Sequence, residues 1–194
     1  MLLRAMMILM MGLGTVQAQD VADPDSAVGM QAMPEKALKK LRAAPEVFLQ
    51  DAAEVIYGFG AKGGIDLAGI DGFIAAERAR FRAREMARYL AADLDNDGDI
   101  SRAEMALLAD AAAAGKRGRL QRGYDQADAN ANGVLTVAEL RGFAQGVALV
   151  QMTDADAEAL RGLMLFDADD NGTVAMEEVA AGVSALVEAG AVGG

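Results

Sequence analysis

Three short acidic segments contain the side chains that are best suited to chemistry: loop A (93–104), loop B (128–139) and loop C (167–178). Each starts with Asp, has Asp or Asn at its third and fifth positions, Gly at its sixth and Glu at its twelfth. Such oxygens suit calcium, a hard cation that takes roughly six to eight oxygen ligands at about 2.3 to 2.6 Å. The Gly permits a positive φ in a tight turn, and the final Glu can supply both carboxylate oxygens. The spacing therefore predicts three calcium loops.

The expected ligands are side-chain oxygens, except that the seventh residue offers its backbone carbonyl and the ninth holds a bridging water. In loop A they are Asp93, Asp95, Asp97, Asp99, Ser101 and Glu104. In loop B they are Asp128, Asn130, Asn132, Val134, Thr136 and Glu139. In loop C they are Asp167, Asp169, Asn171, Thr173 and Glu178, and Ala175 leaves the ninth position without a hydroxyl. Because amides replace two carboxylates in loop B, we expect it to bind less tightly than loop A, and loop C to be intermediate or weaker.

The composition argues against several other kinds of site. The chain of 194 residues contains no Cys and no His, which excludes thiolate and imidazole ligands, disulfides and catalysis by either residue. Its formal net charge of -11 is opposite in sign to a surface that binds phosphates, so we expect no nucleic-acid partner. We also predict no enzyme activity, because the clustered carboxylates are already explained as ligands.

Helices are the elements expected to position these loops. From residue 46 to residue 190, apolar residues recur at helical spacing, and no sustained alternation indicates a strand. The loops start at Asp93, Asp128 and Asp167, which are 35 and 39 residues apart, and each lies between two helical stretches. A repeat of this kind predicts an all-α fold built from helix-loop-helix units.

The three loops resemble those of the EF-hand superfamily, and their arrangement is similar to a calmodulin-type array over residues 46–190. The resemblance implies paired helix-loop-helix units, up to three bound Ca²⁺ ions, and loops joined in pairs by a short backbone bridge at the eighth position. In loop A that position is Ile100, which is expected to face the core.

A fourth unit is expected before loop A, because paired units come in even numbers in the family that the chain resembles. The degenerate loop (58–69) keeps Gly63 at its sixth position and Ile65 at its eighth, but it has none of the side-chain ligands. The alternative is that this Gly-rich stretch is simply a loop. The expected units are 46–81, 82–116, 117–151 and 155–190, with the first paired to the second and the third paired to the fourth.

The N-terminus has the pattern of an export signal. Arg4 precedes a run, 5–16, that is apolar apart from Thr15 and is followed by small residues, and the run is too short to span a bilayer. We therefore predict a signal peptide at 1–18, a periplasmic or secreted location and no stable membrane anchor after cleavage. The alternatives are an uncleaved anchor or an ordinary buried helix. Residues 19–45 are interpreted as a flexible leader followed by a short helix.

Two further features have alternative interpretations. An Arg-rich run, interpreted first as a solvated helix face and alternatively as a docking face for an acidic partner, consists of Arg78, Arg80, Arg82, Arg84 and Arg88. Met86, Met105 and Met164 flank the loops and are assigned to core packing, with a target-binding groove as the alternative.

The sequence thus predicts an exported, non-enzymatic calcium-binding protein that acts as a calcium buffer, a sensor or a calcium-stabilised structural protein. The alternative is an interaction subunit whose partner-binding surface, a hydrophobic groove together with the Arg-rich helix, is stabilised by calcium.

Overall fold

The computed structural model describes residues 32–61 and 63–188, so the expected signal peptide and the leader up to residue 31 lie outside the described residues. The helical elements are α2 (Glu35–Ala43), α3 (Pro45–Phe59), α4 (Leu67–Leu90), α5 (Arg102–Asp110), α6 (Ala114–Ala127), α7 (Val137–Gln151), α8 (Asp154–Arg161), the 3-10 helix η1 (Gly162–Phe166) and α9 (Met176–Glu188). Two short strands, β1 (Ile100–Ser101) and β2 (Val134–Leu135), form the one sheet of the described part. The predicted all-α class is confirmed. Within the described ranges, every helix is too short or too polar to cross a membrane.

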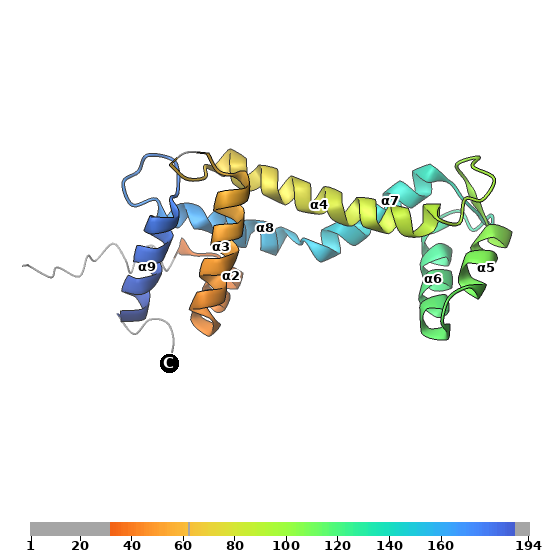
Figure 1. Ribbon diagram of the computed structural model, residues 1–194, viewed down its shortest axis with the longest axis horizontal. Helices are drawn as coiled ribbons and strands as arrows, with labels where there is room; N and C mark the ends of the chain where they lie inside the picture. Colours follow the sequence, from red (N-terminus) through yellow and green to blue (C-terminus); the bar gives the residue numbers. More distant parts are fainter. Residues whose placement is uncertain (1–31, 62, 189–194) are drawn as a thin grey trace, which may run out of the picture.

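The molecule is elongated, with a lobe at each end (Figure 1). The first lobe contains α2, α3 and α9 together with the degenerate loop and loop C, and the second contains α5 and α6 together with loops A and B. Helix α4 runs from the first lobe to the second, and α7 and α8 return beside it. Each lobe therefore holds one pair of loops.

The pairing of the loops differs from the expected one. In the second lobe, Ile100 of loop A pairs with Leu135 of loop B in the antiparallel β1–β2 sheet. In the first lobe, Ile65 of the degenerate loop forms an antiparallel bridge with Val174 of loop C. The second unit thus pairs with the third and the first with the fourth, so the expected pairing of first with second and third with fourth is wrong. The use of the eighth position, including Ile65, is as expected.

The length of α4 explains the correction. Asp66 caps its start by accepting a hydrogen bond from the Gly69 amide (2.8 Å), and 24 residues follow without a Pro. At about 1.5 Å per residue the helix is roughly 36 Å long, so it keeps the loops at its two ends too far apart to pair. The expected unit boundary after residue 81 falls inside this helix, where nothing breaks it.

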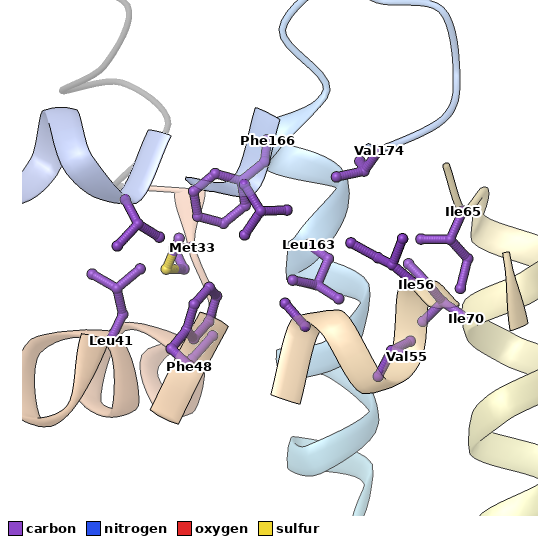
Figure 2. Packing of buried hydrophobic residues seen from close by; sticks show 14 of the residues in the cluster. Met33, Leu41, Phe48, Val55, Ile56, Ile65, Ile70, Leu163, Phe166 and Val174 are labelled. Carbon is purple, nitrogen blue, oxygen red and sulfur yellow. The ribbon is translucent and has the colours of Figure 1, made fainter. Parts of the chain in front are cut away.

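Each lobe has its own hydrophobic core. The core of the first lobe includes Ile65 and Val174 from the paired loops, which Figure 2 shows beside Ile56 and Ile70. The cluster extends to Met33, which is only 8% exposed, although it was expected to belong to a flexible leader. The core of the second lobe consists of Tyr89, Ala92, Ile100, Met105, Leu120, Tyr124, Ala127, Leu135 and Leu140.

The methionines that flank the loops belong to this packing. Met105 is 2% exposed, and Met86 packs against the same cluster while partly exposed. Met164 packs in the same way against the core of the first lobe. These positions agree with the assignment to core packing.

Part of the Arg-rich run faces the returning helices instead of solvent. Arg78 Nε donates to the carbonyl oxygen of Met152 at the end of α7 (3.2 Å), and its Nη2 donates to Asp154 Oδ1 (2.8 Å). Arg82 Nη1 donates to Gln145 Oε1 (3.1 Å). The interpretation of the whole run as a solvated face is therefore wrong for these two residues, which fix α4 against α7 and α8.

The bridge of the first lobe depends on a glycine with a positive φ. Gly64 has φ +132°, and a Cβ added there would lie 2.5 Å from the carbonyl oxygen of Val174, the acceptor of the Ile65 amide (3.0 Å). We expect Gly64→Ala to lower the free energy of unfolding by about 2 to 3 kcal/mol, from strain and a lost hydrogen bond. Urea unfolding followed by circular dichroism measures this.

Gly63→Ala is the matched control, because Gly63 also has a positive φ (+111°) but an added Cβ meets nothing within 4 Å. It should cost about 1 kcal/mol, from backbone strain alone. Equal costs for the two variants would contradict the role of the bridge.

Candidate calcium sites

Loop A gathers its first three carboxylates around one point. One oxygen from each of Asp93, Asp95 and Asp97 lies within 4.8 Å of the others. The Gly98 amide donates to Asp93 Oδ2 (3.2 Å), and the Asp99 amide donates to Asp97 Oδ1 (2.8 Å). Gly98 has φ +91°, the conformation that the sixth position requires. This turn places the two amides where they hold the carboxylates facing inward. The loop therefore presents converging oxygens before any ion is considered.

One buried oxygen of loop A has no hydrogen-bond partner within the described residues. Asp93 Oδ1 is buried and has no hydrogen-bond partner, alone in this respect among the side-chain atoms of the described residues. A buried unpaired carboxylate oxygen is costly unless a cation or a donor satisfies it. Three carboxylates close together also repel one another. Both costs are relieved by a divalent cation with oxygen ligands, so the residues of loop A fit calcium.

Both carboxylate oxygens of Glu104, the twelfth residue of loop A, accept hydrogen bonds. Glu104 Oε1 accepts from the Leu94 amide (2.9 Å), and Glu104 Oε2 accepts from the amide and the hydroxyl of Ser101 (2.8 Å each). These bonds, those from Ser101 first, lower the pKa of Glu104 to about 2. The Ser101 hydroxyl in turn accepts from the Glu104 amide, which completes a capping box at the start of α5. Ser101, expected to hold a bridging water, thus also positions the ligand.

Loop B repeats this arrangement with fewer charges. Asp128 is 4% exposed and accepts from the amides of Asn132 (3.1 Å) and Gly133 (2.9 Å). The Asn132 amide is also 2.9 Å from Asn130 Oδ1, and Asn132 Oδ1 accepts from the Val134 amide (2.8 Å). The side-chain oxygens of Asp128, Asn130 and Asn132 are thus all held by backbone amides of the same turn.

The end of loop B has the same cap as loop A. Glu139 Oε2 accepts from the hydroxyl (2.8 Å) and the amide (3.1 Å) of Thr136 at the start of α7. The bonds from Thr136 lower the pKa of Glu139, so the carboxylate stays charged and able to ligate a cation.

Loop C also brings its acidic ligands together. Oxygens of Asp167, Asp169 and Glu178 lie within 4.8 Å of one another. Glu178 Oε2 accepts from the Ala175 amide (2.8 Å), but Ala175 has no hydroxyl with which to complete the cap. Thr173, expected to ligate through its carbonyl, donates its hydroxyl to Asn171 Oδ1 (2.5 Å). The fit to a cation is good, with one positioning bond fewer than in loop A.

The degenerate loop does not form a comparable ligand set in the part that the structure describes, which omits residue 62. Helix α3 continues to Phe59, and Ala61 forms a bridge with Gly64, so the turn is tighter than in the other loops. Asp66, its one acidic residue, serves as the cap of α4. The described residues leave this loop a structural role through Ile65.

The roles of two residues that connect loops A and B, Tyr124 and Arg102, were not predicted from the sequence. The buried hydroxyl of Tyr124 lies 3.0 Å from the carbonyl oxygen of Ile100 in loop A and 2.7 Å from that of Gly133 in loop B. Burial raises the pKa of Tyr124, so the hydroxyl keeps the proton that it donates. Arg102, at the end of loop A, reaches loop B, since its amide donates to the carbonyl oxygen of Gly133 (3.1 Å). The capping boxes, in contrast, had a signal in the sequence, since Ser-x-x-Glu and Thr-x-x-Glu are the usual pattern.

Comparison with protein families agrees with the geometry of loop A. A family model described as EF hand matches residues 90–109, which include loop A and most of α5. Together with the Asp cluster of loop A, this match supports an EF hand and calcium binding in general. No curated protein and no solved structure matches the chain.

The cap of loop A makes a prediction about pH. We expect Ser101→Ala to raise the pKa of Glu104 from about 2 towards its ordinary value of 4.5, because the variant loses the hydroxyl bond. Ionised Glu104 stabilises the metal-free fold at pH values above 4.5, and this contribution is lost as the pH falls through the folded-state pKa. In the variant this contribution is smaller, and its loss is complete at a higher pH, because the folded-state pKa lies closer to 4.5. Carboxyl-carbon NMR titration in chelator measures the pKa.

Thr153→Ala is the control, because it removes an equivalent capping hydroxyl from α8. It should leave the titration of Glu104 unchanged. An unchanged Glu104 pKa in Ser101→Ala would show that the hydroxyl does not position the carboxylate.

Proposed function

We propose that the protein is a calcium-binding protein without enzyme activity, that it binds up to three ions, and that loops A and B act as a coupled pair. The observation that carries the proposal is the unpaired, buried Asp93 Oδ1 within the carboxylate cluster of loop A. The ligands are those expected from the sequence in all three loops. Calcium supplies the positive charge that these oxygens require.

The coupling of loops A and B rests on a backbone pairing, a shared core and one side-chain hydroxyl. The β1–β2 pairing joins Ile100 to Leu135, and both side chains are fully buried in one core. The Tyr124 hydroxyl links the carbonyl groups of both loops. An ion that orders one loop therefore also orders the backbone of the other, which makes the second binding event more favourable.

Loop C is proposed as an independent site. Its partner across the Ile65–Val174 bridge offers no equivalent ligands, so no second ion is bound to reinforce the first. The lobes are joined by α4 on one side and by α7 and α8 on the other, and their cores do not share residues. Two coupled sites and one separate site are the expected pattern.

The setting and the use of calcium are also proposals. The N-terminal pattern supports export to the periplasm or the exterior. Calcium sites of extracellular modules have dissociation constants of roughly 10⁻⁴ to 10⁻³ M, so permanent loading would make calcium a structural element there. Tighter sites, in the micromolar range, would suit a buffer or a sensor.

The second candidate is an interaction subunit, and one cavity favours it. A cavity of about 670 Å³ opens between α2, α3, α4 and α8, with Phe48, Phe73 and Leu163 among its apolar lining residues. Its charged lining residues are of both signs and include Lys39, Arg80, Asp51 and Glu77. An apolar helix of a partner protein suits such a groove. Binding of a purified partner that is lost in chelator would favour this role over a simple buffer.

Substitution of the twelfth residue tests the sites one by one. We expect Glu104→Gln, Glu139→Gln and Glu178→Gln each to remove one site, because an amide cannot supply two charged oxygens. Glu104→Gln should also weaken loop B by at least about fivefold, the lower range of typical coupling energies, and leave loop C unchanged. The amide resonances of Gly98, Gly133 and Gly172 report the three loops separately in a calcium titration.

Glu177→Gln is the matched control, since Glu177 is exposed in the first turn of α9 beside Glu178. It should keep three sites. Full stoichiometry in all three loop variants would reject the assignment of the ligands, and equal weakening of loops B and C by Glu104→Gln would reject the coupled pair.

A further inference from the structure

Arg102 belongs to the end of loop A but lies across loop B. Its backbone amide donates to the carbonyl oxygen of Gly133 (3.1 Å). Its guanidinium carbon lies 5.4 Å from the centre of the Tyr124 ring, a distance suited to a cation–π contact. Its Nη1 donates to Asp125 Oδ1 (3.1 Å). Three groups in the second lobe, the Gly133 carbonyl, the Tyr124 ring and the Asp125 carboxylate, thus fix the position of this residue.

The guanidinium is close to the first ligand of loop B. Arg102 Nη2 lies 4.0 Å from Asp128 Oδ2, and the Asp128 side chain is 1% exposed. An ideal Cβ on Gly133 would lie 3.7 Å from Arg102 Nε, an ordinary van der Waals distance, so the guanidinium packs against the turn of loop B. Among residues 32–61 and 63–188, Asp128 is the one expected calcium ligand that takes part in an ion pair.

The positive charge of Arg102 should have a large effect on cation binding, because loop B has few negative charges. The side-chain ligands of loop B include two carboxylates, Asp128 and Glu139, whereas loop A offers four at positions 93, 95, 97 and 104. A fixed positive charge beside one of only two carboxylates offsets a considerable part of the attraction for a cation. Arginine also keeps its charge at any ordinary pH, so this offset is permanent.

We propose that Arg102 is the residue that sets the calcium affinity of loop B. It acts as a built-in counter-cation, which stabilises the metal-free loop and lowers the affinity of that loop for calcium. The proposal rests on the proposed function, because it assumes that loop B binds calcium. It would add to the difference in affinity between loop A and loop B that the exchange of Asp for Asn predicts.

Arg102→Gln tests the proposal, with Arg122→Gln as the matched control. Arg122 is exposed on α6 in the same lobe, so both variants change the net charge of the protein equally. We expect loop B of Arg102→Gln to bind calcium about two- to fivefold more tightly than loop B of the control, because the Arg102 side of the ion pair is exposed to solvent and such pairs contribute roughly 0.2 to 1 kcal/mol. The Gly133 amide resonance reports loop B, and Gly172 reports loop C, which should not change.

The metal-free protein provides the second measurement. Loss of the counter-cation should lower the melting temperature of Arg102→Gln in chelator relative to Arg122→Gln. Equal or weaker calcium binding at loop B of Arg102→Gln would overturn the proposal, because a purely structural role of Arg102 predicts weaker binding. If Gly133 of the unmodified protein does not respond to calcium, the proposed function fails for loop B, and the inference fails with it.

Discussion

The unbroken helix α4 is the constraint on which the arrangement of this protein depends. It follows the degenerate loop and leads into loop A. These two loops are neighbours in the sequence, but the 24 residues of α4 keep them at opposite ends of the molecule. Helices α7 and α8 place loops B and C at opposite ends in the same way. Each loop at an end of α4 therefore pairs with a loop at the same end of the α7–α8 segment. The hydrogen bonds that Arg78 and Arg82 donate hold α4 against α7 and α8.

This pairing divides the chemistry between the lobes. The lobe with loops A and B joins two ligand-bearing loops through one small sheet and the Tyr124 hydroxyl. The other lobe joins loop C to a loop whose described residues only complete the bridge and cap a helix. In all three ligand-bearing loops, backbone amides already turn the ligand oxygens inward. Hydrogen bonding therefore brings these oxygens together, and the repulsion between carboxylates is the cost that the proposed cations would relieve.

The sequence was sufficient for the local features and insufficient for the long-range ones. The turns at the three loops were predicted because the calcium-loop pattern restricts the residues at fixed positions within twelve, and the helices followed from the apolar period. The inward orientation of Ile65 and Ile100 followed from the same register. All of these depend on neighbours in the chain.

The pairing of the loops could not be found in this way, because it depends on whether a helix continues through residue 81. The absence of Pro and of late Gly in α4 was the available signal. The position of Arg102 depends on the meeting of loop A with loop B, which follows from the pairing. The burial of Met33 likewise required the first lobe to be assembled, since its neighbours Phe48 and Phe166 are distant in sequence.

A calorimetric calcium titration of the protein, stripped with chelator and measured at physiological magnesium, tests the central claim most directly. The account predicts three equivalents of calcium, two of which bind cooperatively and one independently. Fewer than two equivalents would contradict the assignment of the loops as calcium sites. Three independent equivalents would leave the sites in place but contradict the coupling of loops A and B through their shared sheet.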